Sequence, residues 1–110
     1  MRTMTEDAAT ALLRALGGRF AGFSGLFRVD ELTSRNWASV TFSGARHQVC
    51  FSLEGEGAGV AADAFVAELP DAEYALRGHI LADVALAGDE RSAAGDRVKL
   101  RIEALTVEDN

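Results

Sequence analysis

The residues best suited to chemistry lie in a glycine-rich segment near the middle of the chain. Residues 57–62 read Gly-Ala-Gly-Val-Ala-Ala, which fits the pattern G-x-G-x-x-G/A of dinucleotide-binding loops. In such loops, bare backbone amides and a helix N-terminus hold phosphate. Against this, Glu54 and Glu56 bring negative charge, and the preceding strand is expected in an antiparallel hairpin rather than a parallel βαβ unit. We therefore expect no cofactor and keep four candidates for a small ligand: Gly55, Gly57, Gly59 and His79.

A thiol and an imidazole also lie close together in the sequence. Cys50 and His47 could form a nucleophile and its base, but their positions differ by an odd number, so on a strand they leave opposite faces. His79 and Asp83 share a face but lie four strand residues apart, about 13 Å, which is too far to bind one metal ion. The sequence therefore indicates no catalytic residue and no metal site.

Composition and charge restrict the class of protein. The 110 residues suffice for one domain, spanning residues 1–110, with a single hydrophobic core. The net charge of −6 argues against nucleic acid and anionic membranes, because both reward an excess of lysine and arginine. Cys50 is the only cysteine, so no intramolecular disulfide can form. Glu6 and Asp7 precede an alanine-rich helix, the wrong charge order for a secretory leader, and we expect a cytoplasmic location.

Two amphipathic helices are predicted. The first spans residues 6–16: Thr5 can cap it, or Thr3 and Glu6 can form a capping box, and Gly17 lies just past its end. The second follows the glycine-rich segment and ends at Pro70. Each carries apolar residues at the spacing of one buried helical face. These are Ala9, Leu12, Leu13 and Leu16 in the first helix, and Ala62, Phe65, Val66 and Leu69 in the second.

Residues 37–53 predict a β-hairpin. Gly44-Ala45 serves as its two-residue turn, with glycine first as a type II′ turn requires. Phe42 then faces His47, and the hairpin gains one mostly apolar and one mostly polar face. The polar face carries Trp37, Ser39, Thr41, Gln48 and Cys50.

A second hairpin follows the second helix. With Leu86 opposite Val98, the apolar residues of both strands share one face. Residues 87–97 form the connecting loop, which is polar, contains glycine and is expected to be mobile. The apolar alternation slips at Leu105 and Val107, which indicates a bulge or a twist onto another surface.

The segment from 17 to 36 fits neither the helical nor the strand period throughout. A short strand over 23–29 and a helical turn over 29–32 are both consistent with its pattern. Its phenylalanines are either buried in the core or part of an exposed apolar patch that binds a partner or a second subunit. The interface candidates are Phe20, Phe23, Leu26, Phe27 and Trp37.

The element order α-ββ-α-ββ predicts an α+β domain with an antiparallel sheet of four or five strands, two hairpins in all, covered on one face by two helices. Our first hypothesis is a non-enzymatic binding or accessory protein that acts through protein–protein contact, as a homodimer or with another protein. The alternative is a small-ligand-binding or enzymatic domain with a pocket near residues 55–59 and His79. A third is a structural subunit whose apolar segment is covered by a different chain.

Overall fold

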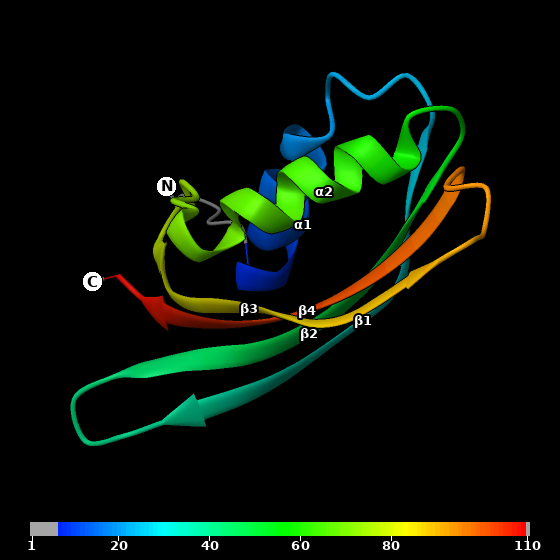
Figure 1. The fold of residues 1–110 in the computed structure, drawn as a ribbon. Coiled ribbons are helices and arrows are strands. Elements are labelled where there is room, and N and C mark those ends of the chain that lie inside the picture. Colours follow the sequence, from blue (N-terminus) through cyan, green and yellow to red (C-terminus); the bar gives the residue numbers. More distant parts are fainter. Residues whose placement is uncertain (1–6, 110) are drawn as a thin grey trace.

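The computed structural model describes residues 7–109, which form two α-helices and one four-stranded antiparallel sheet (Figure 1). The sheet order is β1-β2-β4-β3, so the two hairpins meet along β2 and β4. This confirms the predicted fold class and the order α-ββ-α-ββ. The elements are α1 (Ala8–Arg19), β1 (Leu26–Ala38), β2 (Ser43–Glu54), α2 (Ala58–Glu68), the 3₁₀ turn η1 (Leu69–Asp71), β3 (His79–Arg91) and β4 (Arg97–Glu108).

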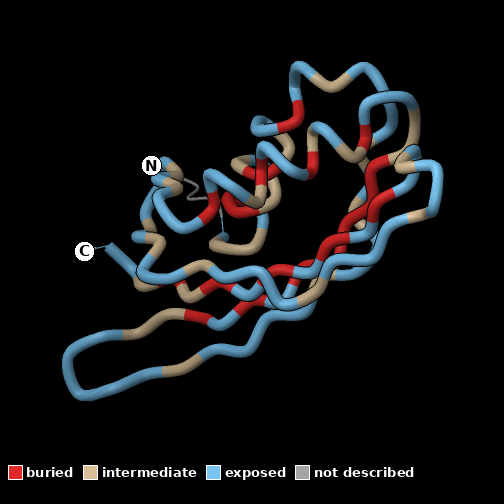
Figure 2. The backbone as a smooth tube through the Cα atoms, viewed as in Figure 1, coloured by how far each residue is buried: buried red, intermediate tan, exposed pale blue. Residues whose placement is uncertain are grey.

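Both helices pack against the same face of the sheet, and the core lies between these two layers (Figures 1 and 2). At its centre Phe51 is fully buried, with its ring 5.5 Å from Phe20, 5.3 Å from Phe27 and 5.6 Å from Phe65. These rings come from the α1–β1 connection, both strands of the first hairpin and α2. Four aromatic rings therefore join the first hairpin to both helical parts of the core.

Helix α1 differs from its predicted limits. Asp7 is the N-cap and its carboxylate accepts a hydrogen bond from the Thr10 N–H at 2.7 Å, which lowers the pKa of Asp7. The predicted caps Thr5, Thr3 and Glu6 lie outside the described residues. At the other end the helix continues through Gly17 to Arg19. Continuing it places Phe20 in the core, and this burial offsets the low helix propensity of glycine.

The first hairpin is longer than predicted and has a different turn. Its connection is residues 39–42, and Gly44 and Ala45 lie inside β2, so the predicted Gly44-Ala45 turn is wrong. His47 therefore pairs with Ser34 rather than Phe42. Extending β1 back to Leu26 aligns three more apolar side chains with the core, at the cost of exposing the tip. The side chains that gain core contact are Phe27, Val29 and Leu32, whereas Val40 and Phe42 are exposed.

The second hairpin also has a shifted register. Leu86 pairs with Ile102 rather than with Val98, although it keeps the predicted face. Strand β3 continues to Arg91, so the connection is residues 92–96 and shorter than the predicted 87–97 loop. The register shifts between Leu81 and Asp83, which is a bulge in β3 opposite the place where the alternation of β4 slips.

Candidate functional site: the uncovered face of the sheet

The face of the sheet turned away from α1 and α2 is uncovered, and we call it the open face (Figure 1). The pairing register aligns its side chains in rows that cross β1, β2, β4 and β3 in that order. Four of these rows carry the charged and apolar side chains that could contact a partner. The tryptophan row is Trp37, Gly44, Val107 and Ile80; the arginine row is Arg35, Arg46, Leu105 and Asp83; the glutamine row is Thr33, Gln48, Glu103 and Ala85; the serine row is Arg28, Ser52, Lys99 and Glu90.

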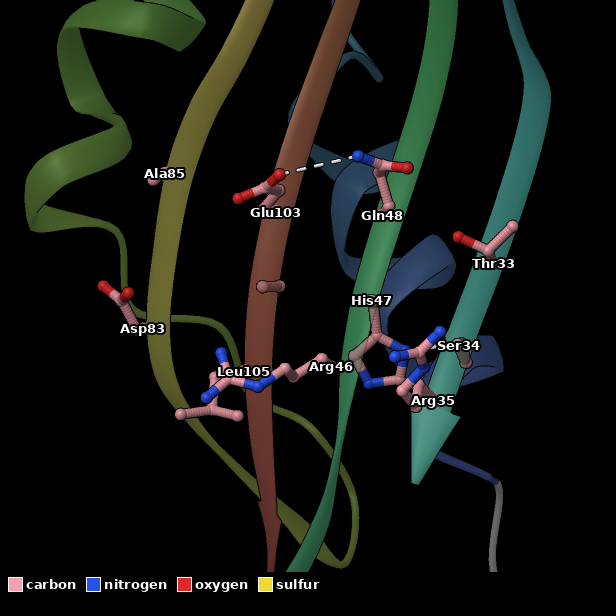
Figure 3. Close-up of a pocket in the computed structure, with 11 residues that line it drawn as sticks. Thr33, Ser34, Arg35, Arg46, His47, Gln48, Asp83, Ala85, Glu103 and Leu105 are labelled. Atoms are coloured by element: carbon pink, nitrogen blue, oxygen red, sulfur yellow. Dashed lines mark hydrogen bonds between the residues drawn. The ribbon is translucent and has the colours of Figure 1, made fainter. Parts of the chain in front are cut away.

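The arginine row places two positive charges directly opposite each other. Arg35 on β1 pairs with Arg46 on β2, and like charges in this position destabilise a sheet. Neither guanidinium forms an ion pair with a carboxylate in residues 7–109. In Figure 3 the Arg46 side chain extends from β2 across β4 toward Leu105. The row thus carries unneutralised positive charge at the β1 side and a carboxylate, Asp83, at the β3 side.

A cavity of about 460 Å³ lies over the arginine and glutamine rows. Its lining includes Arg35, Arg46, Thr33 and Gln48 from the first hairpin and Glu103 from β4 (Figure 3). Gln48 Nε2 donates to Glu103 Oε1 at 3.5 Å across β2 and β4. The cavity therefore has a basic side and an acidic side, a lining suited to groups of both charges rather than to an apolar ligand.

The tryptophan row makes one end of the open face apolar. Ile80 is 52% exposed, and Leu105 and Val107 are half-buried. The Trp37 ring lies against Gly44, where a Cβ atom would come within 2.9 Å of its Cζ2. Trp37 Nε1 is shielded from solvent and has no hydrogen-bond partner in the described part of the chain. This end of the face therefore offers an apolar surface, with an unsatisfied donor buried beneath it.

At the opposite end, the serine row is held by an internal network. Arg28 Nε contacts Asp30 Oδ1 at 3.0 Å, and its Nη2 contacts Glu54 Oε1 at 3.3 Å. Ser52 Oγ donates to Asp30, and this bond is the largest cause of the lowered pKa of Asp30. Here the charges are largely satisfied within the chain, in contrast to the arginine row.

On the other face of β2, His47 belongs to a buried polar network. Its Nδ1 lies 2.7 Å from Ser34 Oγ and its Nε2 lies 2.9 Å from Thr106 Oγ1, while Thr106 Oγ1 donates to the Ala45 carbonyl. Burial lowers the pKa of His47, and the positive potential of His79 lowers it further. His47 is thus a buried structural side chain with both ring nitrogens hydrogen-bonded. As predicted, it faces away from Cys50, which pairs with Arg101.

The glycine candidates lie where the β2–α2 turn meets the β3–β4 connection. The amides of Gly55 and Gly59 donate to the carbonyls of Asp96 and Gly95 at 2.8 Å and 3.0 Å. Gly57 adopts a left-handed conformation, with φ of 84°, which turns the chain into α2. A cavity of about 510 Å³ beside Gly57 also contains two carboxylates and one guanidinium, those of Glu56, Glu68 and Arg19.

The fourth small-ligand candidate, His79, lies elsewhere. It lines a cavity of about 310 Å³ beside the start of α1, with Asp7 and Glu108. Gly57 and His79 thus line two different cavities. Among residues 7–109, no three His, Cys, Asp or Glu side chains are grouped so that they could hold a metal ion.

The interface candidates separate into two groups. Phe20 is buried, and Phe23 and Phe27 are half-buried and pack on the core. Leu26 is 51% exposed at the start of β1, and Trp37 lies on the open face. The phenylalanines thus belong mainly to the core, whereas Trp37 belongs to a surface.

Sequence reasoning placed Arg46 on the polar face of its hairpin but missed Arg35 and Ile80 as members of this surface. For Arg35 the signal was the alternation within residues 26–38, which the bulge at Asp30 interrupts, and for Ile80 it was the register shift between Leu81 and Asp83, which places Ile80 on the other face from Leu86. No helix of the described chain is long and apolar enough to cross a bilayer. No family model, curated protein or solved structure matched the chain.

Proposed function

We propose that this chain is a non-enzymatic cytoplasmic accessory protein that binds another protein chain through the open face. One observation carries this proposal: on a face that neither helix covers, the apolar tryptophan row lies beside two adjacent arginines, Arg35 and Arg46, that have no ion pair in the described residues. Apolar anchors surrounded by charged side chains are the composition of a protein–protein contact. The lone, buried Cys50 is consistent with the proposed reducing compartment.

The charges of the open face favour a protein over a polyanion. Its rows carry both signs: Arg28, Arg35, Arg46, Lys99 and Arg101 are accompanied by Glu31, Asp83, Glu90 and Glu103. Binding to nucleic acid grows with the number of phosphates that lysine and arginine neutralise, and interspersed carboxylates oppose it. A partner protein can instead offer complementary charges of both signs.

The test compares two exposed apolar residues on different sides of the molecule. Ile80→Ser changes the open face, and Val60→Ser changes the outer side of α2, where Val60 is 74% exposed. We expect Ile80→Ser to weaken self-association, or the capture of a partner from a cell extract, by at least tenfold. Val60→Ser should leave both unchanged. The proposal fails if neither form of binding responds to Ile80→Ser, or if both variants lose it equally.

A second candidate function is supported by the cavity over the arginine row. Two guanidinium groups beside Thr33 and Gln48 could hold a small dicarboxylate, because guanidinium groups bind carboxylates through paired hydrogen bonds. Titration of the protein with succinate, followed by amide chemical shifts, tests this function. Saturable shifts confined to the middle of β1 and β2, and abolished by Arg46→Gln, would support it. Absence of shifts at millimolar succinate would exclude this class of ligand.

A further inference from the structure

We propose that the partner of the open face is a second copy of this chain, stacked face to face about a two-fold axis that runs parallel to the strands. This inference rests on the proposed function, and adds the identity of the partner and the orientation of the contact. The order of the charges within the rows of the open face favours this arrangement.

A two-fold axis parallel to the strands reverses each row. Because the strand order is β1-β2-β4-β3, the rotation places β1 over the partner's β3 and β2 over the partner's β4. In the arginine row, Arg35 then faces the partner's Asp83, and the same contact occurs twice by symmetry. Of the two guanidinium groups without an ion pair in each protomer, that of Arg35 therefore meets a carboxylate that also lacks an ion pair within residues 7–109, and Arg46 faces the partner's Leu105 beside it.

The other rows are complementary under the same rotation. Trp37 faces the partner's Ile80, so the apolar ends of the edge strands meet. Gln48 faces the partner's Glu103, and Arg28 faces the partner's Glu90. Stacked sheets keep their strand directions within about 30°, and the long arginine side chains can span the offset that this angle introduces.

The charges also distinguish this arrangement from the other face-to-face two-fold. A two-fold axis that lies between the stacked sheets and runs perpendicular to the strands would place each strand over the same strand of the partner, with the two running in opposite directions. With the axis at mid-strand, Arg35 would face the partner's Arg28, and Asp83 would face the partner's Glu90. Like charges that face each other across an interface oppose association, so of the two axes only the parallel one agrees with the charge pattern.

The area of the face is sufficient for a specific dimer. Its strands have 12 or 13 residues and lie in register. At about 3.3 Å per residue and about 4.8 Å per strand, the four strands cover roughly 750 Å². Specific interfaces bury about 800 Å² on each partner. The open face alone can therefore supply a contact of ordinary size.

The test uses charge reversal at the two residues of the symmetric pair. In Arg35→Asp both contacts would join like charges, and the same holds for Asp83→Arg. We expect the wild-type protein to sediment as a dimer, and each variant to dimerise at least tenfold more weakly. An equimolar mixture of the variants should form a heterodimer, because both contacts then join opposite charges: one joins the two substituted positions, and the other joins the unchanged Arg35 and Asp83. Arg77→Asp and Glu73→Arg, exposed charges on the helix side, are matched controls that should dimerise like wild type.

Three outcomes would overturn the inference: a wild-type protein that is monomeric at several hundred micromolar, a dimer that neither reversal weakens, or a mixture that fails to associate. Circular dichroism of each variant checks that the fold is kept. The failure of the dimer is distinguishable from the failure of the proposed function. A monomeric protein whose capture of another protein still requires Ile80 would retain the function with a different partner.

Discussion

Truncating Phe51 should cause the largest loss of stability that one side chain in this fold can produce. Phe51 is fully buried on β2, and its ring contacts those of Phe20, Phe27 and Phe65. Phe51→Ala removes the buried ring and leaves a cavity that three elements would have to move to fill. Substitutions of this kind cost about 3–5 kcal/mol, and the three lost ring contacts place Phe51 near the upper end of that range.

Phe42→Ala is the matched control, because it makes the same chemical change at the exposed tip of the same hairpin. Phe42 is 58% exposed, so its truncation should change the free energy of unfolding by about 0.5 kcal/mol or less. Urea unfolding followed by far-ultraviolet circular dichroism measures both. With a urea dependence of about 2 kcal/mol per molar, a loss of about 4 kcal/mol lowers the midpoint by roughly 2 M.

Free energies of unfolding extrapolated from urea titrations have a precision of about 10–15%. If the two substitutions lowered the free energy of unfolding by amounts within about 1 kcal/mol of each other, the central role of Phe51 would be refuted. That result would mean that Phe51 does not lie at the centre of the core, or that the hairpin has another register. A large effect of Phe42→Ala alone would point to the predicted Gly44-Ala45 turn, in which Phe42 belongs to the apolar face.

Three further predictions concern the supports of the open face. The pKa of His47 is lowered in the folded protein, so the unfolded chain binds more protons, and the free energy of unfolding should decrease as the pH falls below 6.5, the ordinary pKa of histidine. In urea titrations between pH 8 and 5, His47→Gln should flatten this dependence. Arg91→Ala removes the 2.6 Å contact with Asp63 that joins β3 to α2, but Asp63 is 71% exposed, so thermal unfolding should show a loss of about 1 kcal/mol or less. Gly44→Ala adds a Cβ that overlaps the Thr106 carbonyl and crowds Trp37; we expect about 1–3 kcal/mol of destabilisation and a shifted tryptophan emission, and an unchanged emission would contradict the placement of that ring.

The sequence predicts which face each side chain takes better than it predicts the partner across the strand. In the first hairpin the register differs from expectation, yet Trp37 still shares a face with Gln48 and Cys50. The face on which a side chain lies depends only on the alternation along its strand, so a register shift by an even number of residues leaves it unchanged. The register depends on where the turn lies. The longer hairpin buries Phe27 against the core, and the free energy gained by this burial exceeds the local preference of Gly44-Ala45 for a turn.

The first strand escaped prediction because of its own bulge. Phe27 and Val29 alternate toward the core, but the extra residue Asp30 moves the next core position to Leu32. The segment therefore fits no single period, although every part of it is extended. The arginine row was hidden for the same reason, because Arg35 could be assigned to a face only once that bulge had been located.

The bulges also limit how these sheets can join edge to edge. On β3 the register shifts twice, between Leu81 and Asp83 and between Leu86 and Gly88, whereas β1 is regular after Asp30. An edge that bulges does not readily accept another strand. Growth of an endless ribbon needs two usable edges on every molecule, one to receive a strand and one to offer the next. This chain has a single regular edge, so pairing through β1 would close after two molecules and leave no end from which a fibre could extend.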